Sequence, residues 1–313
     1  MQPHDTEEPA GHVPVLLDAV LSRLAVRPGE TVVDATVGMG GHARALAAAT
    51  GSAGTLVGLD VDPDCLASAR KRLADLPCRL KWIHANFASL AKALESVGLK
   101  KVDVIFADLG VSSTQLEDSA RGLSFQHDGP LDMRLDPRLD VTAADLVNRL
   151  KDKALGDLLY HNAQEHSARR IARRICAVRR EGRITTTRQL AAIVARAAKV
   201  DPASRRSRIH PATRTFQALR MAVNDEVNSL KALLDAAPGL LNPGGRIGII
   251  AFHSGEDRPV KTDFVTRKRM GLYEILTRKP VVAQADERRA NPRSRSAKLR
   301  VARRLGDNDS DAR

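Results

Sequence analysis

Long apolar runs and paired cysteines are both missing from this chain of 313 residues. The longest apolar runs, such as residues 247–252, have the length of a strand and fall far short of the ~20 residues of a membrane helix. The acidic start of the chain lacks the basic and apolar regions of a signal peptide. The three cysteines, Cys65, Cys78 and Cys176, form no C-x-x-C pair, which argues against disulfides or a cysteine zinc site. These absences predict a protein of the reducing cytoplasm with no membrane anchor.

Aromatic residues are scarce as well, at 3% of the chain, which argues against a sheet surface built to stack many bases. Negative charge is outnumbered, because 50 Lys and Arg residues face 37 Asp and Glu residues and leave a net charge of +13. An excess of this size favours a polyanionic partner such as RNA or DNA. A basic soluble surface without a partner would have the same composition. The nine histidines show no spacing typical of metal ligands, so no metal is expected.

Short apolar runs alternate with helical patterns over the first third of the chain. The expected strands are residues 31–35, 55–60, 80–84 and 102–107. This alternation predicts a doubly wound, mostly parallel α/β sheet with helices on both faces. Between about 116 and 210 only helical patterns occur, and a fifth strand is expected at 246–252 after one long helix that includes residues 216–230. The pattern therefore predicts an all-helical domain inserted into an α/β domain.

Ligands of doubly wound sheets bind beyond the carboxyl ends of the strands, where this sequence gathers polar residues and glycines. A loop containing Gly40, Gly41 and His42 follows the first strand, and Asp60 ends the second. Asp60 can accept hydrogen bonds from a ribose. Phe87 follows the third strand, where it can lie beside an adenine, and Asp108 follows the fourth. The G-x-G-G spacing differs from the G-x-G-x-x-G of NAD-binding loops and favours S-adenosylmethionine, which has no diphosphate to bind.

Several longer strings are specific enough to indicate a family. They are residues 12–17 (HVPVLL), 40–42 (GGH), 108–113 (DLGVSS), 129–134 (GPLDMR), 210–220 (HPATRTFQALR), 252–254 (FHS), 256–258 (EDR) and 291–296 (NPRSRS). With these strings the chain resembles the bacterial 16S ribosomal RNA cytosine-N4 methyltransferase family (RsmH, formerly MraW). The resemblance extends from residue 12 to about 305.

The resemblance implies a class I, Rossmann-like methyltransferase fold with S-adenosyl-L-methionine as cofactor. Its implied target is the N4 amino group of cytosine 1402 in the decoding centre of 16S rRNA in the small ribosomal subunit. The implied cofactor-binding residues are Gly40, Gly41, His42, Asp60, Phe87, Asp108 and Gln115. Gln115 rests on the resemblance alone. The expected domains are a leader at 1–11, a methyltransferase domain at 12–115 and 211–305, an RNA-recognising insertion at 116–210 and a tail at 306–313.

Two roles remain open for Asp108. As a catalytic residue it would accept a hydrogen bond from the target amine, or it would only contact the cofactor. The insertion carries a dense group of basic residues, Arg169, Arg170, Arg173, Arg174, Arg179, Arg180 and Arg183. These form either an RNA-contacting face or an ordinary solvated helix face. Alternative functions are methylation of another nucleic acid or a small molecule, or a non-catalytic role in ribosome assembly. The sequence does not decide between a monomer and a homodimer.

Overall fold

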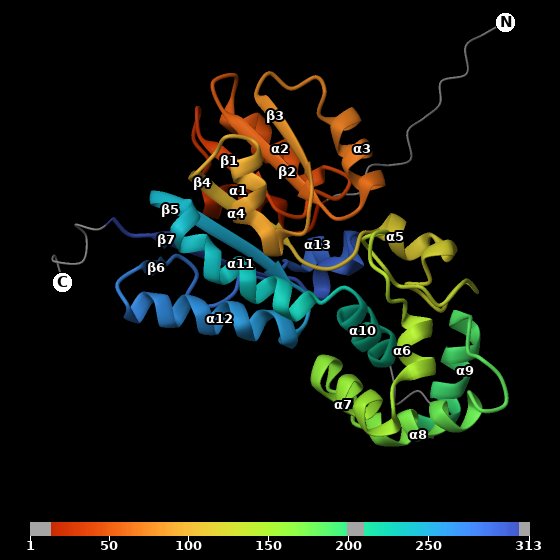
Figure 1. Cartoon of the computed structure of the whole chain (residues 1–313). Coiled ribbons are helices and arrows are strands. Elements are labelled where there is room, and N and C mark those ends of the chain that lie inside the picture. The colour runs from red at the N-terminus through yellow and green to blue at the C-terminus, as the bar shows by residue number, and fades with distance from the viewer. Residues whose placement is uncertain (1–13, 199–209, 307–313) are drawn as a thin grey trace, which may run out of the picture. The chain divides into compact units, whose positions relative to one another are not determined.

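The computed structural model describes residues 14–198 and 210–306 (Figure 1). The chain divides into two compact units. The first unit combines residues 1–110 with 230–313, and the second consists of residues 111–229. No helix in the described parts of either unit is long and apolar enough to cross a membrane.

The first unit is built on a seven-stranded sheet with the order β3-β2-β1-β4-β5-β7-β6. Its strands are β1 (Thr31–Asp34), β2 (Thr55–Asp60), β3 (Arg79–His84), β4 (Val102–Asp108), β5 (Leu241–Ala251), β6 (Tyr273–Ile275) and β7 (Lys298–Arg304). β1 to β5 are parallel, and β7 runs antiparallel to both of its neighbours. The predicted doubly wound, mostly parallel sheet is therefore confirmed.

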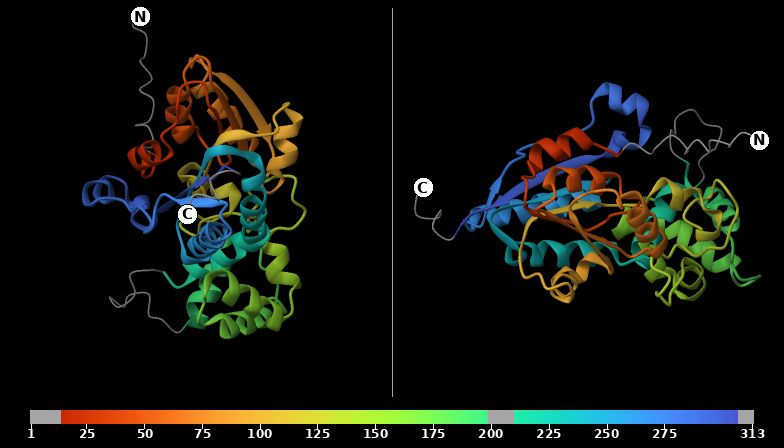
Figure 2. Two further views of the ribbon diagram at one scale, coloured as in Figure 1. Left: turned by 90° about the vertical axis from the view of Figure 1, so that its left-hand side faces the viewer. Right: turned by 90° about the horizontal axis from the view of Figure 1, so that it is seen from above.

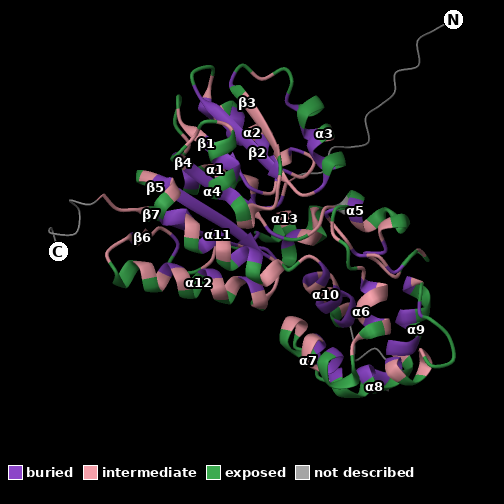
Figure 3. Ribbon diagram, in the orientation of Figure 1, coloured by how far each residue is buried: buried purple, intermediate pink, exposed green. Residues whose placement is uncertain are grey.

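Helices cover both faces of this sheet because its central strands carry apolar side chains on both sides. One face packs against α1 (Leu17–Leu24), α2 (Gly41–Thr50) and α3 (Pro63–Arg72). The other face packs against α4 (Leu90–Ser96), α11 (Glu226–Leu240) and α12 (Ser254–Arg269). The central strands β1, β2, β4 and β5 are largely purple in Figure 3, whereas the outer sides of these helices are exposed.

The fifth strand, expected at 246–252, begins earlier and contains an irregularity. β5 begins at Leu241, and its register with β4 jumps from Val102↔Leu241 to Val104↔Arg246. The four residues between, Asn-Pro-Gly-Gly, therefore bulge out of the ladder, and Gly244 takes the left-handed φ of +78° that such a bulge requires. The Asn242 amide donates to Oδ1 of Asp103 at 2.7 Å and holds the bulge against β4.

The second unit is helical. It contains α5 (Ser113–Glu117), α6 (Ala143–Arg149), α7 (Asp152–Ala163), α8 (Ala168–Val178), α9 (Thr187–Ala198), α10 (Ala212–Val223) and the short η2 (Ser119–Arg121). The unit extends beyond the insertion expected at 116–210, because Phe216 and Leu219 of α10 pack into the same core as Ile171 and Leu190. The single helix expected over 216–230 is broken at Asp225, whose φ is +48°, into α10 and α11.

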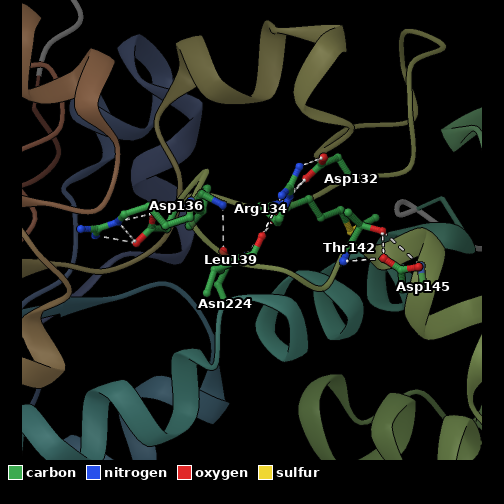
Figure 4. Close-up of polar contacts among 10 residues, drawn as sticks. Asp132, Arg134, Asp136, Leu139, Thr142, Asp145 and Asn224 are labelled. Atoms are coloured by element: carbon green, nitrogen blue, oxygen red, sulfur yellow. Dashed lines mark hydrogen bonds and ion pairs between the residues drawn. The ribbon is translucent and has the colours of Figure 1, made fainter.

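A long loop between η2 and α6 is fixed by polar contacts (Figure 4). The Arg134 guanidinium donates to both carboxylate oxygens of Asp132 and to the Leu139 carbonyl. The Asn224 side chain accepts from Leu135 N at 2.8 Å and donates to Met133 O at 2.8 Å. Met133 is fully buried in the helical core and has a left-handed φ of +67°. The 129–134 string therefore has a structural role within the helical unit.

Replacing Asn224 with Ala is expected to lower the free energy of unfolding by about 3 kcal/mol, because it removes three part-buried side chain–backbone bonds, to Leu135, Met133 and Arg220, worth ~1 kcal/mol each. Urea denaturation measures this loss. Asn228→Ala is the matched control, since Asn228 is exposed and bonds only to Asp225. Equal stabilities of the two variants would contradict the assigned role of Asn224.

Candidate functional site

The glycine-containing loop joins β1 to α2 at the carboxyl edge of the sheet. Gly40 has a φ of +82°, and a Cβ there would lie 2.7 Å from Cδ1 of Leu73 and 3.3 Å from the Ala69 backbone. A Cβ on Gly41 would lie 2.7 Å from Cγ of Pro14. In the sequence, these glycines were interpreted as positions where a ligand approaches the backbone closely. The structure shows that packing against α3 and the start of the chain already requires them.

Hydrogen bonds fix this loop to the ends of two flanking strands. Gly38 N donates to Oδ2 of Asp60 at 2.8 Å, at the end of β2. Asp108 N donates to Oγ1 of Thr36 at 2.7 Å, at the end of β4. The other Asp60 oxygen, Oδ1, accepts from Asp62 N at 3.0 Å. Asp60 thus shapes the loop, and its remaining lone pairs are still able to accept ribose hydroxyls.

Three carboxylates end the neighbouring strands β2, β1 and β4, namely Asp60, Asp34 and Asp108. The pKa of Asp34 is raised to about 7, mainly by burial and also by the charge of Asp60, while the hydrogen bond from the Thr36 N–H lowers it. Burial also raises the pKa of Asp60 to about 6. The pKa of Asp108 rises to about 8, through burial first and then through the Asp34 charge. Oδ2 of Asp34 and Oδ1 of Asp108 are buried without a hydrogen-bond partner.

His42 connects this group to the beginning of the described chain. Its Nε2 donates to the Val15 carbonyl at 2.8 Å, because a carbonyl can only accept. Its Nδ1 lies 3.5 Å from Oδ2 of Asp108, and its ring lies 4.9 Å from that of Phe106. Only 7% of His42 is exposed. His42 is therefore placed to orient Asp108 rather than to contact solvent.

The remaining predicted residues lie in separate elements. Phe87 begins η1 (Phe87–Ser89), three residues beyond β3, and is held there by Asn86, whose side chain accepts from Ala88 N at 2.8 Å. Gln115 belongs to the second unit, where it completes a capping box at the start of α5 and accepts from Ser112 N at 2.9 Å. The first unit thus gathers Gly40, Gly41, His42, Asp60, Phe87 and Asp108 at one sheet edge.

Two residues of this edge were missed in the sequence. Asp34 ends β1 just as Asp60 ends β2 and Asp108 ends β4, so an acid at the end of a buried run was the available signal. Arg293 acts on Asp108 from a distant part of the chain, where its positive charge lowers the pKa that burial raises. No local pattern places Arg293 near Asp108. Arg293 lies at this edge because β7, which follows it, runs antiparallel to β5 and so begins where the parallel strands end.

Residues 9–305 match the MraW methylase family. This chain belongs to that family. A ribosomal RNA small subunit methyltransferase H from Synechococcus sp. (strain CC9902) is 49% identical over 301 residues, covering 95% of this chain and 98% of its own. Another from Acidobacterium capsulatum is 46% identical over 295 residues, covering 93% and 97%. A solved rRNA methylase from Streptococcus thermophilus covers 95% and 100%, with 13% identity and a TM-score of 0.41.

Membership of the MraW family confirms the resemblance seen in the sequence, and S-adenosylmethionine is the cofactor expected for such a methylase. The strand-end residues fit this molecule. It carries a positively charged sulfur and an ammonium group, and one oxygen each of Asp34 and Asp108 is buried without a hydrogen-bond partner. Asp60 and Phe87 offer an acceptor for the ribose and a ring for the adenine.

The pKa of Asp34 predicts how this MraW-family protein responds to pH without cofactor. Because the folded pKa of about 7 exceeds the unfolded value near 3.8, the folded state binds more protons between these values, and stability falls as pH rises. Asp34→Asn removes this proton uptake. Relative to the variant, the wild type should lose on the order of 1 kcal/mol per pH unit between pH 5 and 7. Urea denaturation over this range measures the difference, and parallel curves for both proteins would contradict it.

Proposed function

We propose that this protein methylates the N4 amino group of a decoding-centre cytosine, position 1402, of 16S rRNA in the small ribosomal subunit. Methylation of small-subunit ribosomal RNA is supported by the family and by the names of relatives 46–49% identical. The observation that carries the amine as target is Asp108, whose buried oxygen lies unpartnered at the carboxyl edge of the sheet. An amino group, unlike a ring carbon, offers hydrogens to such an acceptor.

The proposed cofactor site consists of Gly40, Gly41, His42, Asp60, Phe87, Asp108 and Gln115. When bound, S-adenosylmethionine supplies a methyl group on a positively charged sulfur, which is a good leaving group. Asp60 accepts from the ribose while it keeps the Gly38 loop in place. Asp34 provides negative charge beneath the loop. Because the leaving group is already good, positioning and exclusion of water account for most of the catalysis.

Asp108 has a further role toward the substrate. The lone pair of the cytosine amine is delocalised into the ring, and a hydrogen bond from the amine to a carboxylate helps to localise it on nitrogen. Asp108 must be ionised to accept this bond and the proton that the amine loses. Arg293 lowers the pKa of Asp108, whereas burial, Asp34 and Glu256 raise it. A cation bound beside it lowers the pKa further.

Asp108→Asn tests this role because it keeps the shape and removes the negative charge. Turnover is expected to fall about 100-fold, which is typical for loss of a proton acceptor, while the Kd for S-adenosylmethionine changes less than about tenfold. Single-turnover kinetics and calorimetry measure the two quantities. Equal losses in both would leave Asp108 as a cofactor ligand only.

The helical unit is the proposed RNA-recognition domain, and its structure sorts the seven arginines. Four of them are held by the protein. Arg169 pairs with Asp157, Arg183 pairs with Asp145, Arg170 donates to Ala198 O, and Arg179 donates to the carbonyls of Val147 and Leu150. Arg173, Arg174 and Arg180 are exposed, and among the described residues Arg173 makes only a 3.4 Å contact with Arg169 O. These three are the arginines available to RNA phosphates.

Replacing Arg173 and Arg174 with Ala is expected to weaken binding to small subunits and to flatten its salt dependence. The slope of log K against log salt should fall by about 1.4–1.8 if both contact phosphates. The Kd for S-adenosylmethionine should not change. Lys268→Ala/Arg269→Ala removes the same charge from the exposed end of α12 and serves as control. A wild-type slope in the Arg173/Arg174 variant would place RNA recognition elsewhere, with 210–220 and 293–304 the next candidates.

The function itself is tested by methyl transfer from labelled S-adenosylmethionine to small subunits isolated from a strain that lacks the enzyme. Digestion of the RNA to nucleosides should give N4-methylcytidine as the labelled nucleoside. A different methylated nucleoside would support another nucleic-acid target. Tight binding of subunits without transfer would support an assembly factor and contradict the proposal.

A further inference from the structure

A basic cavity lies in the first unit, on the segment of chain that connects β6 to β7. Here the chain forms α13 (Ala285–Ala290) and η3 (Pro292–Ser296), which stand out from the sheet in both views of Figure 2. A shallow cavity of about 440 Å³, wide open to solvent, lies between them and is lined by Ala285, Arg288, Arg289 and Arg295. All three arginines are exposed. This place is distinct from the arginines of the helical unit.

Neighbouring acids balance only part of the positive charge around this cavity. Arg289 pairs with Asp286. In the described part of the chain, the side chains of Arg288 and Arg295 have neither an ion-pair nor a hydrogen-bond partner. The other nearby acid, Glu287, accepts from Leu16 N at 2.7 Å and is used to hold α13 to the chain start. Converging like charges without a counterion indicate a site for an anion.

The cavity is connected to the methyl-transfer edge through a short series of contacts. Glu287 bonds to Leu16, the neighbouring Val15 bonds to His42, and His42 faces Asp108. Arg293 of η3 is close enough for its charge to lower the pKa of Asp108. The base of the segment is fixed as well, because Ala283 and Ala297 are buried in the core beside β5 and β7.

The arginines farther along the chain do not contribute to this site. Arg300 bonds to Asp257 at 2.6 Å, Arg303 pairs with Glu274, and Arg304 donates to Leu241 O at 2.9 Å. These bonds hold β7 to its neighbours. Of the basic 293–304 segment, Arg295 is therefore the exposed arginine that remains for a ligand.

We propose that the α13–η3 cavity binds a phosphodiester of the substrate RNA beside the nucleotide that is methylated. This inference rests on the proposed function. Guanidinium groups match phosphate oxygens with paired hydrogen bonds, and three of them around one cavity can hold a backbone phosphate at a fixed position. The cofactor is not the occupant, because its net charge is positive. The first unit thus binds RNA itself and holds the target nucleotide next to Asp108, independently of the helical unit.

The test is Arg288→Ala/Arg295→Ala in the full-length protein, with binding to unmethylated small subunits measured over a range of salt concentrations. We expect the affinity at low salt to fall at least about tenfold and the slope of log K against log salt to fall by about 1.4–1.8. Thermal stability and the Kd for S-adenosylmethionine should stay at their wild-type values. Arg288→Lys/Arg295→Lys keeps the charge and should retain most of the slope.

Lys268→Ala/Arg269→Ala is again the matched control. These two residues lie at the end of α12, shortly before Tyr273 begins β6. Tyr273 is paired in the sheet with Arg304, the last residue of β7, at the edge opposite the carboxyl ends of β1 to β5. A wild-type slope in the Arg288/Arg295 variant would overturn the inference. A second result would also overturn it: calorimetry shows that inorganic phosphate binds the wild type but not the variant, while the two proteins bind RNA equally. The cavity would then be a site for free anions only. If the wild-type protein fails to methylate subunits, the proposed function is contradicted instead. The binding measurement and the methylation assay therefore test the two proposals separately.

Discussion

The burial of carboxyl groups at the ends of three adjacent parallel strands is the constraint on which this site depends. β2, β1 and β4 lie side by side, so their last residues, Asp60, Asp34 and Asp108, come together beneath one loop. Burying carboxylates is costly unless each is protonated, hydrogen-bonded or matched by a cation. Backbone N–H groups satisfy Asp60, whereas Asp34 and Asp108 each keep a buried oxygen without a partner. A positively charged cofactor supplies what the protein alone lacks.

The sequence predicted most of this edge because buried runs and the polar residues that end them are local signals. Asp60 and Asp108 were found in this way, and Asp34 had the same signal. The reason for Gly40 and Gly41 could not be found locally, since Leu73 and Pro14 meet them only in the folded chain. The same limit applies to the arginines, because a guanidinium bonded to a carbonyl and a free one look alike in sequence.

The helices and strands were predictable from their apolar spacing, whereas two irregularities, a break between helices and a bulge within a strand, were missed. The apolar spacing of α10 continues into α11, so nothing in it marks the break at Asp225. The Asn-Pro-Gly-Gly run has the composition of a turn, yet β4 pairs with the strand on both sides of it. In both places tertiary partners decide the outcome. Phe216 joins α10 to the helical core, and Asp103 holds the bulge.

The central claim is that the buried carboxyl groups of Asp34 and Asp108 hold protons until a cation arrives. The most direct measurement is calorimetry of S-adenosylmethionine binding at pH 7 in buffers of different ionisation enthalpy, which counts the protons released. The account predicts release of about one proton, less for S-adenosylhomocysteine with its neutral sulfur, and less for Asp34→Asn. Binding of S-adenosylmethionine without proton release, or equal release with both ligands, would contradict it.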